Sequence, residues 1–141
     1  MRSYTTSSLW QKWASYDLAA RLAKFSLVGG SGVVVNTAAL YLFYQFGHLP
    51  LVMASVLAVE LAIVNNFLWN DRWTFHQRDR SPLRFLRFNL VALGGLAITT
   101  TTLALVTSFG VYYLLANLLG IALATAWNFT LSVLWTWRWD G

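Results

Sequence analysis

The chain has 141 residues, of which 57% are hydrophobic and only 11% are charged, and it contains no cysteine. A soluble domain carries roughly a quarter charged residues, so the composition argues against a soluble enzyme, and the lack of cysteine excludes disulfides, thiolate nucleophiles and cysteine metal sites. The formal net charge of +5 is compatible with either nucleic acid or anionic lipid as a partner. The clustering of the charges favours a membrane, and we expect no nucleic acid partner.

Residues 1–24 are expected to form a cytoplasmic amphipathic segment. Within Ser8–Lys24, apolar side chains recur every three or four residues, opposite charged ones. This pattern is typical of a helix that lies in the lipid headgroup region. The alternative is a partly disordered tail. No cleavable signal peptide is evident, because these residues contain no uninterrupted apolar core.

Two long stretches contain no Asp, Glu, Lys or Arg, from Phe25 to Val59 and from Phe88 to Trp137. A membrane span needs about 20 apolar residues, so each stretch is too long for one helix and suits a hairpin of two. Gly and Pro at residues 47–50, and Gly110 in the second stretch, mark the turns. The transmembrane domain is therefore predicted at residues 25–139, with spans at residues 25–46, 49–69, 88–109 and 111–137.

The basic residues define the predicted topology. Of the ten Lys and Arg residues, four precede the first span, five lie in the central loop and one follows the last span. The positive-inside rule then places both termini and the central loop in the cytoplasm. All eight tryptophans fall in the cytoplasmic half of this topology, where they suit an interfacial belt. The chain is predicted to be a multi-pass membrane protein.

The two halves of the chain repeat one another. The matching parts are Arg21–Val28 with Arg84–Val91, Gly32 with Gly95, and Asn66 with Asn128. Each half holds two spans, so both halves enter the membrane in the same orientation. The predicted fold class is an all-α membrane protein with four transmembrane helices, arranged as two parallel two-helix repeats, and with an N-terminal amphipathic helix.

A set of motifs covering most of the chain resembles the GtrA-like family. They are the basic-Phe-x-x-Val-Gly-Gly of Lys24–Gly30, Glu60 followed by Asn65–Phe67, the Asn-Asp-Arg-Trp-Thr-Phe of Asn70–Phe75, the Arg-Phe-x-Arg-Phe of Arg84–Phe88, and Trp127–Phe129. The family often has Asn-Arg where this chain has Asn70-Asp71-Arg72. The departure leaves open whether Arg72 faces a lipid phosphate or pairs locally with Asp71.

The resemblance implies a small protein of the bacterial inner (plasma) membrane that functions in cell-surface polysaccharide synthesis. The leading hypothesis is translocation, or flipping, of a polyprenyl-phosphate-linked sugar, next to a glycosyltransferase that loads the lipid. The alternative is a non-transporting anchor or recruiter of that transferase. A second alternative is a small proton-coupled exporter.

No catalytic role is expected, and neither a cofactor nor a metal site. The glycines follow no strand and precede no Gly-Lys-Ser/Thr, so they do not form a nucleotide-binding loop. One subunit offers little room to enclose a lipid headgroup, and we therefore expect a homodimer.

Glu60 is the only charged side chain within a predicted span. An acidic residue at the bilayer centre costs roughly 2.5–3.5 kcal/mol on insertion scales, so its side chain should face protein or water. One interpretation is that Glu60 binds sugar hydroxyls or carries a proton, and the other is that it joins helices by hydrogen bonds. Asn36 lies at a similar depth in the first span and is a candidate partner.

The remaining candidate substrate-binding residues lie toward the cytoplasmic ends of the spans. Asn65, Asn66 and Asn128 either contact substrate or join neighbouring helices by hydrogen bonds. Lys24, Arg72 and Arg87 lie near the membrane surface, where basic groups can hold a phosphate. Their alternative role is to fix the topology and attract anionic lipid, at about 1 kcal/mol per residue.

Overall fold

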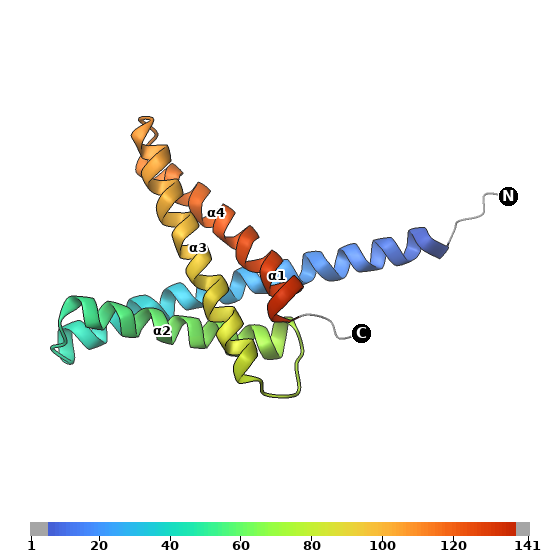
Figure 1. Ribbon diagram of the computed structural model, residues 1–141, viewed down its shortest axis with the longest axis horizontal. Coiled ribbons are helices and arrows are strands. Elements are labelled where there is room, and N and C mark those ends of the chain that lie inside the picture. The colour runs from blue at the N-terminus through green and yellow to red at the C-terminus, as the bar shows by residue number, and fades with distance from the viewer. Residues whose placement is uncertain (1–5, 138–141) are drawn as a thin grey trace. The chain divides into compact units, whose positions relative to one another are not determined.

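The computed structural model describes residues 6–137, and their side chains from residue 16 onward. Figure 1 shows the described part of the chain as helices joined by turns, without strands. The elements are α1 (Thr6–Tyr41), the π-helical segment η1 (Leu42–Phe46), α2 (Leu51–Trp69), the π-helical η2 (Asn70–Thr74), α3 (Pro82–Ser108), α4 (Tyr113–Leu131) and the π-helical η3 (Ser132–Thr136).

The chain divides into two compact units, residues 1–77 and 78–141. We call the pair formed by α1 and α2, with η1 and η2, the first hairpin, and the pair formed by α3 and α4, with η3, the second hairpin. Within residues 6–137, four helices are long and apolar enough to cross a membrane: Tyr16–Phe46, Leu51–Thr74, Pro82–Ser108 and Tyr113–Thr136. The predicted fold class, an all-α protein with four transmembrane helices, is confirmed, and the chain is a multi-pass membrane protein.

The first helix is longer than its membrane span. α1 runs without interruption from Thr6 to Tyr41, so the helix does not break between the predicted N-terminal segment and the first span. Lys24 of α1 lies level with Trp73 in η2, and the earlier residues of α1 continue past the end of this hairpin (Figure 1). The location of those residues in the headgroup region stays a prediction.

Proline and glycine determine where the hairpins turn. Pro50 precedes the first residue of α2, and Pro82 begins α3, where a missing backbone N–H removes no helical hydrogen bond. Ser81 caps α3, its Oγ accepting a hydrogen bond of 3.3 Å from the backbone N–H of Arg84. Gly110, in the turn between α3 and α4, has a φ of +84°, a conformation that glycine adopts without steric cost.

The two hairpins end in the same way. η2 and η3 occupy equivalent positions in the sequence repeat, and each directly extends the second helix of its hairpin. The backbone N–H of Phe75 donates to the carbonyl of Asn70 at 2.8 Å, and that of Trp137 donates to the carbonyl of Ser132 at 2.8 Å. The duplication seen in the sequence therefore extends to a local widening of the helix, which hydropathy did not predict.

Small residues bring the helices of each hairpin together. Ala54 and Ala58 of α2 are fully buried, as is Ala116 of α4, and Gly120 is buried one turn further along α4. Most of the large aliphatic side chains are exposed on the outer faces of the hairpins. This arrangement suits a hydrocarbon solvent, in which leucine gains little by burial and close backbone approach stabilises the helix pair.

In each hairpin a glycine of the first helix packs directly against an asparagine of the second. A Cβ atom on Gly32 would lie only 2.5 Å from Nδ2 and 2.7 Å from Cγ of Asn66. A Cβ atom on Gly95 would lie 2.5 Å from Oδ1 and 2.6 Å from Nδ2 of Asn128. Each glycine therefore makes room for a carboxamide at the same position of the repeat.

Gly32→Ala is expected to destabilise the first hairpin, because the added methyl group would overlap the Asn66 carboxamide. Overpacking of this kind typically costs 1–3 kcal/mol. Gly30→Ala is the matched control, since a Cβ atom there meets nothing within 4 Å and alanine is the better helix former by about 1 kcal/mol. Thermal unfolding of both variants in detergent measures the difference. Equal melting temperatures would show that the Gly32–Asn66 contact is not tight.

Candidate functional site

We call the end of each hairpin that carries the basic residues its basic end. At the basic end of the first hairpin, Nζ of Lys24 lies 5.6 Å from the centre of the Trp73 ring. A cation at this distance over an indole is attracted to the ring by about 0.5–2 kcal/mol. Trp73 therefore holds the ammonium group at the basic end of this helix pair.

An apolar groove lies beside this cation. Its volume is about 340 Å³, and it is lined by Leu27, Val28, Ser31, Trp69 and Trp73. Trp73 lines the groove and also contacts Lys24, so a positive charge adjoins the apolar groove of the first hairpin. This combination suits an amphiphilic ligand with an anionic head and a hydrocarbon tail.

The second hairpin repeats the cation but changes the groove residues. Arg87 occupies the position of Lys24, with its guanidinium carbon 5.8 Å from the centre of the Trp135 ring. Its Nη1 also donates a hydrogen bond of 3.3 Å to the backbone carbonyl of Trp135. Gly94 and Leu131 stand where the first hairpin has the groove residues Ser31 and Trp69.

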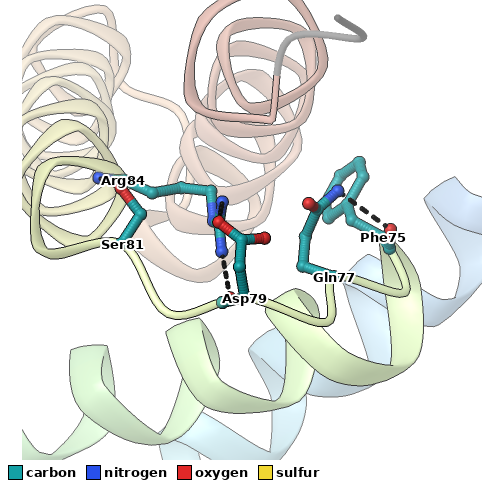
Figure 2. A network of polar contacts seen from close by, with 5 residues as sticks. All are labelled: Phe75, Gln77, Asp79, Ser81 and Arg84. Atoms are coloured by element: carbon teal, nitrogen blue, oxygen red, sulfur yellow. Dashed lines mark hydrogen bonds and ion pairs between the residues drawn. The ribbon is translucent and has the colours of Figure 1, made fainter.

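The first basic residue of each repeat has a different environment. Arg21 pairs with Asp17 at 3.0 Å, and Arg84 pairs with Asp79 at 3.5 Å. Figure 2 shows the Arg84 side chain turned toward Asp79, whose backbone carbonyl also accepts a hydrogen bond of 2.7 Å from Nη2. Both arginines therefore have a carboxylate beside them, whereas Lys24 and Arg87 each lie over a tryptophan.

Polar side chains continue from the groove into the first hairpin. Nδ2 of Asn65 donates to Oγ of Ser31 at 2.9 Å and to Oδ1 of Asn66 at 3.3 Å. Ser31 lines the groove, so this pair connects the groove to the carboxamide packed against Gly32. In the second hairpin the residue equivalent to Asn65 is Trp127, whose Nε1 donates to the backbone carbonyl of Val91 at 3.2 Å.

The other predicted site residues are more dispersed. Glu60 is exposed on α2, and Asn36 is half-buried on α1. The side chain of Arg72 in η2 is exposed, whereas that of its neighbour Asp71 is buried, at 7% exposure. Asn128 lies within the second hairpin beside Gly95. Of the predicted residues, Lys24, Asn65 and Asn66 are the ones that the first hairpin brings together around the groove.

Sequence reasoning did not assign Trp73, Trp135 and Ser31 to the site. The tryptophans were interpreted as interfacial anchors, and Ser31 was not singled out. A usable indication was present, because Lys24 matches Arg87 and Trp73 matches Trp135 in the repeat. A basic residue and a tryptophan that recur together in both halves indicate a contact between them.

Comparison with known proteins agrees with the geometry of a membrane domain. The family model described as GtrA/DPMS, transmembrane domain, matches residues 24–137. A protein of Pyrococcus furiosus named dolichol-phosphate mannosyltransferase is 40% identical over 119 residues, which are 83% of this chain and 34% of that protein. The chain therefore spans about a third of the length of this curated relative.

The hydrogen bond between Ser31 and Asn65 is expected to stabilise the first hairpin. A double-mutant cycle of Ser31→Ala and Asn65→Ala should give a coupling energy of about 0.6–1.7 kcal/mol, the range found for interhelical hydrogen bonds in membranes. Chemical unfolding in mixed micelles provides the measurement. Strictly additive effects of the two substitutions would indicate that the side chains do not interact.

Proposed function

The chain belongs to the GtrA/DPMS transmembrane-domain family, and from that premise we propose that it binds a polyprenyl-phosphate-linked sugar at the basic end of the first hairpin and moves it across the membrane. The membrane in this proposal is the bacterial inner membrane, with both basic ends and both termini in the cytoplasm. The chain is the membrane-embedded, non-catalytic component of the pathway, and a separate glycosyltransferase loads the lipid.

The observation that carries the proposal is the adjacency of the Lys24–Trp73 contact and the apolar groove. A polyprenyl phosphate has an anion at one end of a long hydrocarbon, and these are the two features that the basic end of the first hairpin complements. In this proposal Lys24 attracts the phosphate. Leu27 and Trp69, which line the groove, contact the isoprene chain. The indole rings of Trp69 and Trp73 also suit stacking against a sugar.

The polar residues of the first hairpin support a path for the sugar. Ser31, Asn65 and Asn66 form a hydrogen-bonded cluster next to the groove. Glu60 lies six residues from Asn66 along α2, about 9 Å at the rise of an α-helix. In our proposal the sugar hydroxyls exchange between these groups as the headgroup moves away from the basic end.

The movement has to be driven from outside the chain. The sequence contains no phosphate-binding loop for ATP, so transport would be downhill, coupled to a gradient, or dependent on a partner. We also propose that the chain acts as a homodimer, because one groove on one hairpin covers little of a sugar headgroup.

A second candidate function is supported by the relative from Pyrococcus furiosus. That protein is named a mannosyltransferase, and this chain matches only a third of its length. A membrane domain that resembles part of a named transferase could anchor or recruit a separate transferase without transporting lipid. In this case the segment Ser8–Lys24 and the loop Arg72–Arg87 would form the docking surface.

Lys24→Gln and Trp73→Leu are expected to weaken binding of polyprenyl phosphate. Loss of a charge-assisted contact of about 1.5–3 kcal/mol corresponds to roughly a tenfold to a hundredfold rise in Kd. The measurement is binding of a fluorescent polyprenyl phosphate to the purified protein in nanodiscs. Arg80→Gln is the matched control, because it removes one positive charge at an exposed loop position. If all three substitutions weakened polyprenyl phosphate binding to a similar extent, the binding would not be specific to the Lys24–Trp73 site.

Transport and anchoring are separated by Glu60→Gln. In proteoliposomes that contain a fluorescent lipid-linked sugar, the proposal predicts protein-dependent exchange between the leaflets, and at least a tenfold slower rate in the variant. Copurification with a polyprenyl-phosphate glycosyltransferase should be unchanged, because Glu60 lies away from the basic end. If the wild-type protein copurifies with the transferase but gives no exchange, the anchoring function is correct and the transport proposal is wrong.

A further inference from the structure

A row of polar side chains runs along the second hairpin. Asn128, Ser132 and Thr136 follow one another at four-residue spacing along α4 and η3, so they share one face of the helix. Ser132 is 0% exposed and Thr136 is 3% exposed. Among the residues that the structure describes, Oδ1 of Asn128, Oγ of Ser132 and Oγ1 of Thr136 are all buried and lack a hydrogen-bond partner.

The protein around this row is apolar. Val91 and Phe88 of α3 are 2% and 5% exposed, and the Phe88 ring lies 5.3 Å from that of Trp137, immediately after η3. The Val91 and Phe88 side chains cannot form hydrogen bonds, and the indole N–H of Trp137 makes none to these three oxygen atoms. A polar group without a partner inside a membrane domain costs several kcal/mol, so three adjacent ones require a partner that is not a side chain of this hairpin.

The first hairpin has the same row with its polar atoms bonded. The residues equivalent to Asn128, Ser132 and Thr136 are Asn66, Asn70 and Thr74. Oγ1 of Thr74 donates to Oδ1 of Asn70 at 2.8 Å, and Oδ1 of Asn66 accepts from Asn65 at 3.3 Å.

Two exchanges between the repeats explain the difference. Ser132 has one hydroxyl oxygen where Asn70 has a whole carboxamide group, so it cannot reach Thr136 as Asn70 reaches Thr74. Trp127 replaces Asn65 and donates to the backbone of Val91 instead of to the neighbouring asparagine. The second hairpin therefore keeps polar residues at the same three positions but lacks the side chains that bond them in the first hairpin.

We propose that the second hairpin contains an internal water-binding site, in which an ordered water molecule takes the place of the Asn70 carboxamide and bridges Ser132 and Thr136. Side chains four residues apart have Cβ atoms about 5–6 Å apart, a gap that one water can bridge with two hydrogen bonds of about 2.8 Å. A buried water typically makes about three hydrogen bonds, and the hydroxyl groups of Ser132 and Thr136 supply two of its partners.

The geometry and chemistry favour water over a cation. A metal ion such as calcium needs oxygen ligands at about 2.3–2.6 Å, usually with carboxylates among them. This row contains only neutral groups and no carboxylate, so its chemistry does not suit such an ion. The inference does not depend on lipid binding or transport, so it stands or fails separately from the proposed function.

Removal of the hydroxyl groups is expected to change the melting temperature in opposite directions, depending on whether the row holds water or is dry. If water bridges Ser132 and Thr136, then Ser132→Ala and Thr136→Val each remove a hydrogen bond from the water and lower the melting temperature of the full chain in detergent by a few degrees. If the row is dry, each substitution removes an unsatisfied buried hydroxyl and raises the melting temperature. A rise in both variants would overturn the proposal.

Ser132→Asn provides a second test, because it restores the arrangement of the first hairpin and displaces the water. X-ray radiolysis produces hydroxyl radicals from internal water, so we expect oxidation of the buried Trp137 in the wild-type protein and a several-fold decrease in the variant. Phe75, the equivalent buried ring of the first hairpin, serves as the internal control and should not change. Equal oxidation of Trp137 in both proteins would contradict a water site at Ser132.

Discussion

Hydrocarbon offers no hydrogen bonds, so the polar groups in these helices have to find their partners within the protein or in bound water. Where Asn66 packs against Gly32 the requirement is met, because its Oδ1 accepts a hydrogen bond from Asn65. Where Asn128 packs against Gly95, its Oδ1 has no partner among the described residues. The glycine removes a side chain from one helix, and the carboxamide of the other helix occupies the space. In the first hairpin the Gly32–Asn66 contact adjoins the hydrogen-bonded residues Ser31 and Asn65.

The candidate site is explained by duplication of one helix hairpin and by later substitutions that differ between the two copies. Both hairpins carry a cation over a tryptophan at the basic end, which is a stable way to keep positive charge at a membrane surface. Ser31, Asn65 and Trp69, by contrast, belong to the first hairpin, whereas the second has Gly94, Trp127 and Leu131 at these positions. One hairpin thus carries the groove and its polar cluster, and the equivalent positions of the other are occupied mainly by apolar groups.

Much of the fold was predictable because its determinants are local in the sequence. Charge-free stretches, turn residues and the repeat gave the four helices and their pairing. The π-helical segments and the uninterrupted α1 were not predicted, since hydropathy does not distinguish a widened helical turn from a regular one, and a change from amphipathic to apolar composition does not break a helix. The rotation of each helix about its own axis could not be predicted from the sequence either, because packing between the helices sets it. Asn66 was therefore predicted near the end of its helix without being assigned to Gly32, and the exposure of Glu60 on α2 could not be anticipated.

The central claim is that the basic end of the first hairpin binds a lipid-linked phosphate. Photocrosslinking with a polyprenyl phosphate that carries a diazirine in its first isoprene units, followed by peptide mass spectrometry, tests this most directly. The account predicts that the crosslinked peptides contain Leu27–Ser31 and Trp69–Trp73, and that unlabelled polyprenyl phosphate competes with the crosslinking. Crosslinks concentrated at the opposite end of the hairpin, or spread evenly over the lipid-facing residues of all four helices, would contradict it.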